Sequence, residues 1–189
     1  ILNGSKIFIT NSATAMTLGS TVQVISGEKD GKPEFTTFLM ENDTPGFSQE
    51  PMNRKMMWRA SNTGRLTFEN VVLSDENILG VPGQGSRIML ATLDGGRLSI
   101  AAMGLGCAQG AYEMALAYSK EREQFGKPIS KFQAVSFKLA DMAMKIEAAR
   151  CLLYKACRMK DAGLPFGKEA AMAKLYCSEV AAEVCDNAV

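Results

Sequence analysis

The stretch that decides the fold is a short loop between two helical patterns. It reads Arg122-Glu123-Gln124-Phe125-Gly126-Lys127-Pro128-Ile129, with Leu93-Asp94-Gly95-Gly96-Arg97 well upstream and a helical run over residues 132–150 after it. The loop sets two cations, an amide and an aromatic ring around a glycine, a combination that suits a phosphate next to a flat ring. A loop between helices also needs Gly and Pro as breakers and charges for solvation, so the loop alone leaves both interpretations open.

The helix after this loop has the clearest periodicity in the sequence. Its apolar residues recur at spacings of three and four, which is typical of a bundle seam; they are Phe132, Val135, Leu139, Met142, Ile146, Ala149, Leu153 and Ala156. The start of the helix is predicted to be a capping box, Ser130-Lys131-Phe132-Gln133. Asp141 and Lys145 are predicted to form an ion pair on its outer face. Gly163 is predicted to end the helix. An alanine-rich third helix follows from Pro165. Three long helices joined by short loops predict an up-down bundle that lacks its last helix.

The helix before the loop, which runs to about Lys120, contains two groups of glycines. Gly95-Gly96 costs about 1 kcal/mol per glycine relative to alanine, which indicates close approach of a ligand or a second backbone, or a kink. Asp94 and Arg97 lie three apart and share a face, either as a surface ion pair or as part of a site. Gly104-x-Gly106 with Gly110 lacks the preceding strand and the spacing of a dinucleotide fingerprint. We therefore interpret these glycines as points where helices pack closely.

The first part of the chain has strand patterns and no alternation of strands with helices. Strands are predicted over residues 5–10, 21–26, 35–41 and 65–73, with a turn over residues 28–33 in which Gly31 takes a positive φ and Pro33 ends the pairing. Gly80-Val81-Pro82-Gly83-Gln84-Gly85 predicts a hinge-like linker. The expected fold class is α+β, with an antiparallel β domain over residues 1–82 and a truncated helical bundle over residues 83–189.

Two places in the β domain exceed what strand formation needs. Phe8-Ile9-Thr10-Asn11 ends a strand with an aromatic ring and a hydroxyl at i and i+2, and therefore on one face. Such a pair suits a flat heterocycle, whereas a core Phe followed by a turn-forming Thr-Asn is the plainer interpretation. Met56-Met57-Trp58-Arg59 holds the only tryptophan and is expected to cover the junction between the β domain and the bundle.

Composition excludes several classes of protein. The chain has 21 Lys and Arg against 20 Asp and Glu, so no basic excess points to nucleic acid. No apolar run approaches the roughly 20 residues of a membrane span, and no membrane association is expected. The five cysteines form no C-x-x-C pair, which favours free thiols in a reducing compartment. Because histidine is absent, Ser-His and Cys-His triads and the usual metal sites are excluded.

The two ends suggest an internal piece of a longer protein. The sequence opens on Ile1 and stops at Val189 within a helical pattern, with no Gly, Pro or basic last turn. No targeting segment would be visible in such a piece.

Together these motifs resemble the acyl-CoA dehydrogenase family, over essentially the whole chain and in the family's order and spacing. The matching segments are Leu2-Asn3-Gly4-Ser5-Lys6 before Phe8-Ile9-Thr10-Asn11, Leu66-Thr67-Phe68-Glu69-Asn70-Val71, Asn77-Ile78-Leu79-Gly80, Leu93-Asp94-Gly95-Gly96-Arg97, and the loop from Arg122 to Ile129 with Gln133 and Leu139-Ala140-Asp141-Met142. The details are most similar to short-chain or butyryl-type members. Met57 departs from the pattern, since many members carry Gly there.

The resemblance implies roles for individual residues. FAD would lie between the β domain and the bundle, with Phe8 and Ile9 beside the isoalloxazine ring and Thr10 hydrogen-bonded near its reactive nitrogen. The acyl-CoA site would be lined by Asp94, Gly95, Gly96 and Arg97. The diphosphate and adenine end of FAD in a neighbouring subunit would be reached by Arg122, Gln124, Phe125 and Gln133, and Gln133 would then both cap its own helix and bind FAD.

The resemblance also implies an activity in fatty acid β-oxidation. A carboxylate removes the α-proton of a short-chain acyl-CoA and the β-hydrogen leaves as hydride to the flavin, which gives the trans-2-enoyl-CoA. In most members that Glu lies beyond the position of Val189, and in a minority it precedes the Arg97 position, where this chain has Gly96. No catalytic base is therefore assigned within the chain, and no metal.

Partners and location follow from the same resemblance. An electron transfer flavoprotein would accept the electrons, and the enzyme would be a homotetramer built as a dimer of dimers. It would lie in the cytoplasm of a bacterium or in the mitochondrial matrix of a eukaryote. The alternatives are an acyl-CoA oxidase or nitroalkane-oxidase-like flavoenzyme of the same fold, and a non-catalytic module that only assembles with partners.

Overall fold

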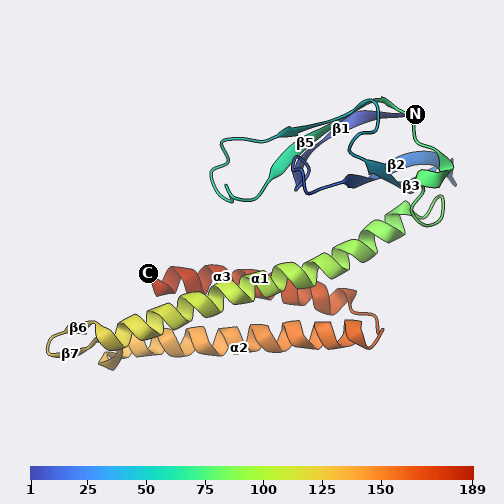
Figure 1. Ribbon diagram of the computed structural model, residues 1–189. Coiled ribbons are helices and arrows are strands. Elements are labelled where there is room, and N and C mark those ends of the chain that lie inside the picture. The colour runs from blue at the N-terminus through green and yellow to red at the C-terminus, as the bar shows by residue number, and fades with distance from the viewer. The chain divides into compact units, whose positions relative to one another are not determined.

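Antiparallel strands make up the first part of the chain and three long helices the second, in the computed structural model, which describes residues 1–189 (Figure 1). The chain divides into unit 1, Ile1–Leu90, and unit 2, Ala91–Val189. Every strand pairing is antiparallel, and three helices follow the sheets, so the predicted α+β class is confirmed.

Unit 1 contains two sheets. The first has the order β1-β5-β4 and the second pairs β2 with β3. The bounds of these strands are β1 Leu2–Thr10, β2 Gly19–Lys29, β3 Lys32–Glu41, β4 Phe47–Pro51 and β5 Thr63–Val71. The four predicted strands are confirmed, and β4 was missed because only Phe47 among its five residues has strand-typical apolar character. In the structure Phe47 stacks on Phe68 of β5 with ring centroids 5.3 Å apart, which gives β4 its place in the sheet.

The turn between β2 and β3 is shorter than predicted. Asp30 and Gly31 have φ of 52° and 70°, the pair of positive values that a two-residue type I′ hairpin needs. Pro33 lies inside β3 opposite Glu28, so the prediction that it ends the pairing is wrong. An edge strand tolerates proline because its outward backbone needs no donor at that position.

The segment expected to be a hinge-like linker is tied to β3 instead. The Leu79 N–H donates to the Thr37 carbonyl at 2.8 Å, and the Gly83 N–H donates to the Thr36 hydroxyl at 3.0 Å. A side chain at Gly85 would place its Cβ 2.8 Å from the Phe35 carbonyl oxygen, so only glycine allows this approach. The hinge prediction is therefore wrong.

Three helices form the core of unit 2: α1 Gly85–Glu121, α2 Gln133–Asp161 and α3 Gly167–Ala188. The predicted seam of α2 is confirmed in its centre, where five of the eight residues are buried: Met142, Ile146, Ala149, Leu153 and Ala156. They pack against Leu98, Ala101, Leu105 and Ala108 of α1 and Ala170, Ala173, Cys177, Val180 and Val184 of α3. Burial raises the pKa of the Cys177 thiol.

The ends and the outer face of α2 differ in part from the prediction. The capping box is wrong, because Ser130 lies in the 3-10 turn Ile129–Lys131 and α2 begins at Gln133 with Phe132 as N-cap and no side-chain cap bond. The C-terminus is confirmed: Gly163 has φ 69°, and a Schellman pair of bonds closes the end. Lys145 pairs with Glu183 of α3 and not with Asp141, which ties α2 to α3.

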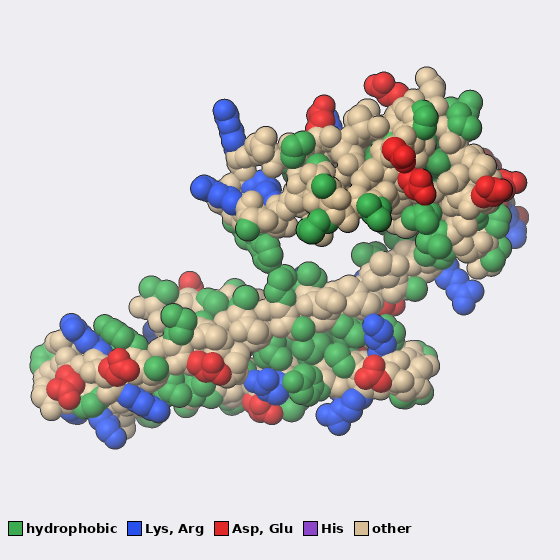
Figure 2. All heavy atoms as spheres, viewed as in Figure 1, with side chains coloured by type: hydrophobic (Ala, Val, Ile, Leu, Met, Phe, Trp, Pro, Cys, Tyr) green, Lys and Arg blue, Asp and Glu red, His purple; other side chains and the backbone are tan.

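The first helix, α1, is more apolar than its sequence pattern indicated. By length and composition alone α1 could cross a membrane, since no charged residue occurs between Leu98 and Tyr112. Small residues and methionines spread this character along the helix, so no long run of large apolar residues stands out. Four of its side chains lie in the bundle core, and the same composition fits a helix packed among others. Hydrophobic side chains are visible on the surface of the helical unit in Figure 2.

Candidate functional site

The end of β1 presents an aromatic ring and a hydroxyl to the surface. Phe8 is 68% exposed with φ 62°, and Thr10 is exposed, while Ile9 between them packs on the unit 1 core. The register with β5 shifts between Lys6 and Ile9, so Phe8 sits in a β-bulge. Left-handed backbone at a bulky residue is strained and is concentrated at binding sites. The core interpretation of Phe8 is wrong, and sequence patterning gave no sign of the bulge.

Asp94 and Arg97 of α1 form the predicted i,i+3 ion pair, in which the Arg97 Nη1 donates to the Asp94 Oδ1. Both side chains remain partly exposed. The second carboxylate oxygen of Asp94 lies 3.0 Å from the point where a Cβ on Gly167 would sit, beside the first turn of α3. Glycine at position 167 therefore leaves room for the carboxylate at a helix N-terminus, where negative charge is favoured.

The glycines next to this pair face open space. A Cβ built on Gly96 meets no atom of the chain within 4 Å, and on Gly95 it meets only the Lys160 Nζ, at 3.9 Å. No second backbone of this chain approaches either glycine, so packing within the chain does not account for Gly95 and Gly96. The close-packing interpretation holds for Gly104, which lies against the Cys177 backbone of α3, but not for Gly106 or Gly110, whose Cβ positions are open.

The loop from Arg122 to Ile129 is a tight β-hairpin. The strands β6, Glu123–Gln124, and β7, Lys127–Pro128, flank Phe125 and Gly126, whose φ values are 54° and 77°. The Ile129 N–H donates to the Arg122 carbonyl at 2.8 Å and closes the hairpin base. Phe125 is 91% exposed at the tip, and its ring meets the edge of Phe132 at 6.2 Å. The Lys127 Nζ lies 4.4 Å from the centre of the Phe132 ring, which helps to hold the hairpin.

The polar groups assigned to a cofactor are not engaged within the chain. The side chains of Thr10, Arg122, Gln124 and Gln133 make no hydrogen bond or ion pair in the structure and are exposed. The competing capping role of Gln133 disappears with the capping box. Uncommitted donors next to exposed aromatic rings fit a nucleotide that carries a flat ring and a diphosphate. The residues present therefore suit FAD.

Comparison with known proteins gives a match along the whole chain. The model of the acyl-CoA dehydrogenase C-terminal domain matches residues 83–189, and that of the acyl-CoA dehydrogenase middle domain matches residues 1–71. The chain belongs to the acyl-CoA dehydrogenase family. FAD is the cofactor of this family, and one of the similar solved structures contains it.

Individual relatives agree with the family. A short-chain specific acyl-CoA dehydrogenase of Megasphaera elsdenii is 48% identical over 188 residues, which are 100% of this chain and 49% of that protein. The structure of butyryl-CoA dehydrogenase from the same organism superposes with a TM-score of 0.91 at 46% identity, over 98% of this chain and 48% of that one. A structure of PigA with FAD and proline has a TM-score of 0.91 at 30% identity, over 100% of this chain and 49% of that one. The chain thus spans about half the length of the relatives it matches.

Proposed function

We propose that the protein containing this chain dehydrogenates a short-chain acyl-CoA thioester to the trans-2-enoyl-CoA, with FAD as its cofactor. The observation that carries the proposal is the Asp94–Arg97 pair beside two glycines whose open side no part of the chain fills. The 48% identity to a relative described as short-chain specific supports the choice of acyl chain. When bound, FAD would supply the acceptor for the β-hydrogen.

In this proposal the chain's own residues bind and orient. The open backbone at Gly95 and Gly96 lets the thioester lie close to α1, and Arg97, held by Asp94, offers its remaining donors to substrate oxygens. Phe8 and Thr10 supply a stacking surface and a hydrogen-bond donor at the end of β1. Arg122 and Gln133 supply charge-assisted and amide hydrogen bonds for a diphosphate.

The base that removes the α-proton belongs, in this proposal, to a part of the protein outside the 189 residues. Asp94 is committed to Arg97 and lies beside the first turn of α3. Glu121 and Glu123 border the hairpin assigned to the cofactor, and Gly96 occupies the position where some relatives place the base. The chain covers 49% of the Megasphaera elsdenii relative, so about half of that relative has no counterpart in these 189 residues.

The proposal has three further parts. The protein is a homotetramer built as a dimer of dimers, and an electron transfer flavoprotein accepts its electrons. Its location is the cytoplasm or the mitochondrial matrix. Its support for assembly is the Phe125 tip, an exposed aromatic ring that nothing in this chain covers. Sedimentation of the intact protein with bound FAD should give a tetramer, and a monomer that retains all its FAD would contradict this part.

The direct test uses the intact protein and the isolated chain in parallel. Intact protein with FAD should convert butyryl-CoA to the enoyl product, whereas residues 1–189 should not, because proton abstraction needs a carboxylate held at roughly 3 Å from the α-proton. Arg122→Ala in the intact protein should lose FAD on dialysis, since one charge-assisted bond is worth about 1.5–3 kcal/mol. Lys29→Ala, at the exposed β2–β3 hairpin, is the control and should retain FAD.

An oxidase of the same fold is the second candidate. It would use the same residue roles as those proposed above, and it is supported by the likeness to PigA, whose structure is described with FAD and proline. Rapid reaction of the reduced intact protein with oxygen would favour the oxidase, and slow reaction the dehydrogenase. Failure of the intact protein to retain any FAD would instead favour a non-catalytic assembly module.

A further inference from the structure

The loop between β4 and β5 exposes three large apolar side chains in succession. Met56, Met57 and Trp58 are 89%, 61% and 57% exposed, and Trp58 is the only tryptophan in the chain. In Figure 1 the segment between these two strands projects beyond the end of the sheet. An exposed apolar patch that is bordered by polar residues marks a site of interaction with a protein or a membrane. The Met56–Trp58 tip is therefore a candidate interaction surface of unit 1.

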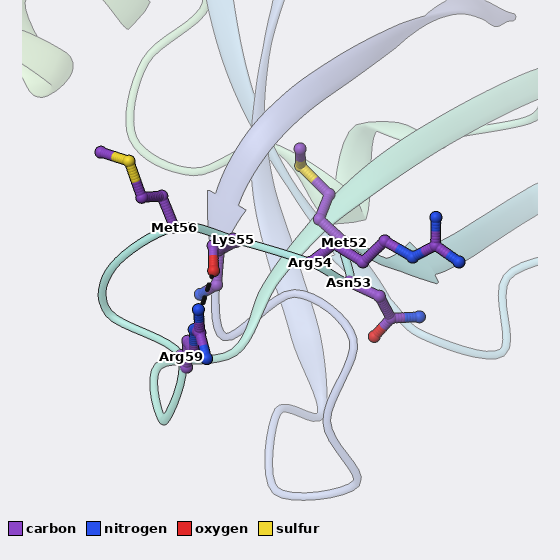
Figure 3. Close-up of a pocket in the computed structure, with 6 residues that line it drawn as sticks. All are labelled: Met52, Asn53, Arg54, Lys55, Met56 and Arg59. Carbon is purple, nitrogen blue, oxygen red and sulfur yellow. Dashed lines mark hydrogen bonds between the residues drawn. The ribbon is translucent and has the colours of Figure 1, made fainter.

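Three cations border this tip without a counter-ion. Arg54, Lys55 and Arg59 form no ion pair in the structure, and residues 51–68 contain no Asp or Glu. The three side chains line a surface hollow of about 450 Å³, which is drawn in Figure 3. Uncompensated positive charge beside an apolar tip favours a partner that is both anionic and apolar.

Hydrogen bonds within the loop hold the tip in place. The Lys55 Nζ donates to the Ser61 carbonyl, and the Arg59 Nε donates to the Lys55 carbonyl at 3.1 Å. Trp58 has φ 55°, a left-handed conformation that costs energy for a bulky residue and persists where the surrounding structure fixes it. Lys55 thus holds the loop, whereas the Arg54 side chain extends away from it and is free for a partner (Figure 3).

This combination of groups fits the surface of an anionic bilayer. Tryptophan is enriched at membrane–water interfaces, where its amphipathic ring lies at the level of the head groups. Lysine and arginine next to it are attracted by anionic lipids. A fluid lipid surface can adapt to a projecting tip, whereas a protein partner would need a preformed pocket to cover it. The expectation of no membrane association concerns segments that span a bilayer, and a loop at its surface needs no such segment.

We propose that the Met56–Trp58 tip inserts into the head-group layer of an anionic phospholipid bilayer, with Arg54 and Arg59 contacting the lipid phosphates. The inference goes beyond the proposed function and does not depend on it, because binding to a bilayer requires no turnover. Trp58 and Arg54 carry the test, since the side-chain hydrogen bonds that hold the loop come from Lys55 and Arg59.

The experiment measures co-sedimentation of the intact protein, with FAD bound, and lipid vesicles. The protein should bind vesicles of phosphatidylcholine mixed with an equal amount of phosphatidylglycerol, and high salt should release it. It should bind weakly to vesicles of phosphatidylcholine alone. Arg54→Ala should weaken binding to the mixed vesicles about fivefold, which is the contribution of one cation near an anionic surface. Trp58→Ala should weaken it about tenfold through the loss of a buried aromatic side chain.

Two matched controls lie elsewhere in unit 1. Lys29→Ala removes an exposed cation at the β2–β3 hairpin, and Val72→Ala shortens an apolar side chain that is exposed just after β5. Both should bind the mixed vesicles as the unmodified protein does. Trp58→Phe keeps an aromatic ring in the loop and should also bind. Lipids brominated on their acyl chains should quench part of the tryptophan emission of the unmodified protein, and this quenching should disappear in Trp58→Phe.

Several results would overturn the assignment. Absence of binding to the mixed vesicles, or equal binding by Trp58→Ala and the unmodified protein, would exclude insertion of the tip. Equal binding by Arg54→Ala would exclude a phosphate contact at that residue. If polyglutamate, a soluble acidic polymer, displaced the protein from the vesicles and brominated lipids caused no quenching at Trp58, the loop would be a site for acidic proteins and the lipid assignment would be wrong.

Discussion

Replacing Gly104 by alanine should destabilise the helical unit, although alanine is the better helix former. A Cβ at this position would lie 3.0 Å from the Cys177 carbonyl oxygen and 3.3 Å from its carbonyl carbon, so α1 and α3 would have to move apart by a few tenths of an ångström. The alanine gains about 1 kcal/mol in helix propensity over glycine. Overpacking its Cβ against the Cys177 backbone costs about 1–3 kcal/mol. The net effect should be a loss of up to about 2 kcal/mol.

Gly106 provides the matched control two residues further along the same helix. Its Cβ position is open, so Gly106→Ala gains the propensity without a contact and should stabilise the chain by about 1 kcal/mol. Because the propensity gain is common to both variants, their difference isolates the cost of the α1–α3 contact, about 1–3 kcal/mol. Urea unfolding of the 189-residue chain followed by far-UV circular dichroism measures both. If Gly104→Ala stabilises as much as Gly106→Ala, then α1 does not pack on α3 at Cys177.

Three further changes test the bundle. Leu153→Ala, at a buried seam position, should lower the free energy of unfolding in urea by about 2–5 kcal/mol. Met144→Ala, on the exposed face of the same helix, should change it little. Equal effects of the two substitutions would mean that the seam lies elsewhere on the helix. Burial raises the pKa of Cys177 above its ordinary 9.0, so the folded state favours the neutral thiol. Stability should then fall as pH rises past about 9, and Cys177→Ala should remove that dependence; a fall of the same size in this variant would assign it to other groups. Gly163→Ala should cost about 1 kcal/mol through its left-handed backbone alone, since no atom lies within 4 Å of the added Cβ, and an unchanged urea midpoint would show that the helix end adapts.

The parts of the fold that sequence predicted are those set by repeating local patterns. The centre of the α2 seam, the i,i+3 pair of Asp94 and Arg97 and the glycine that ends α2 follow from helix geometry and were all confirmed. The ion pair of Lys145 was predicted wrongly because a partner four residues away is visible in sequence, whereas Glu183 approaches only once α3 has packed. Tertiary contacts override local ones at such positions.

The sequence named candidate site residues, but it did not predict the local structure that presents them. The exposed ring of Phe8 depends on a bulge in the pairing of β1 with β5, which a single strand pattern does not encode. The hairpin that presents Phe125 is built from two-residue strands, too short for any periodicity. The tethering of residues 79–85 to β3 depends on a hydroxyl and backbone carbonyls supplied by a distant strand. The role of each site residue stays a prediction.

At the Phe125 tip, the stability of the isolated chain and the proposed assembly favour different residues. Its left-handed backbone costs about 1–2 kcal/mol for a residue with a side chain, and its exposed ring forgoes the roughly 1.5–3 kcal/mol that burial would bring. Glycine at this position would relieve the strain and remove an exposed apolar group, so the isolated chain would become more stable and more soluble. The same change would take away the ring to which we assign a role in the proposed assembly. Selection of variants for stability alone should therefore favour Phe125→Gly and yield protein that no longer assembles.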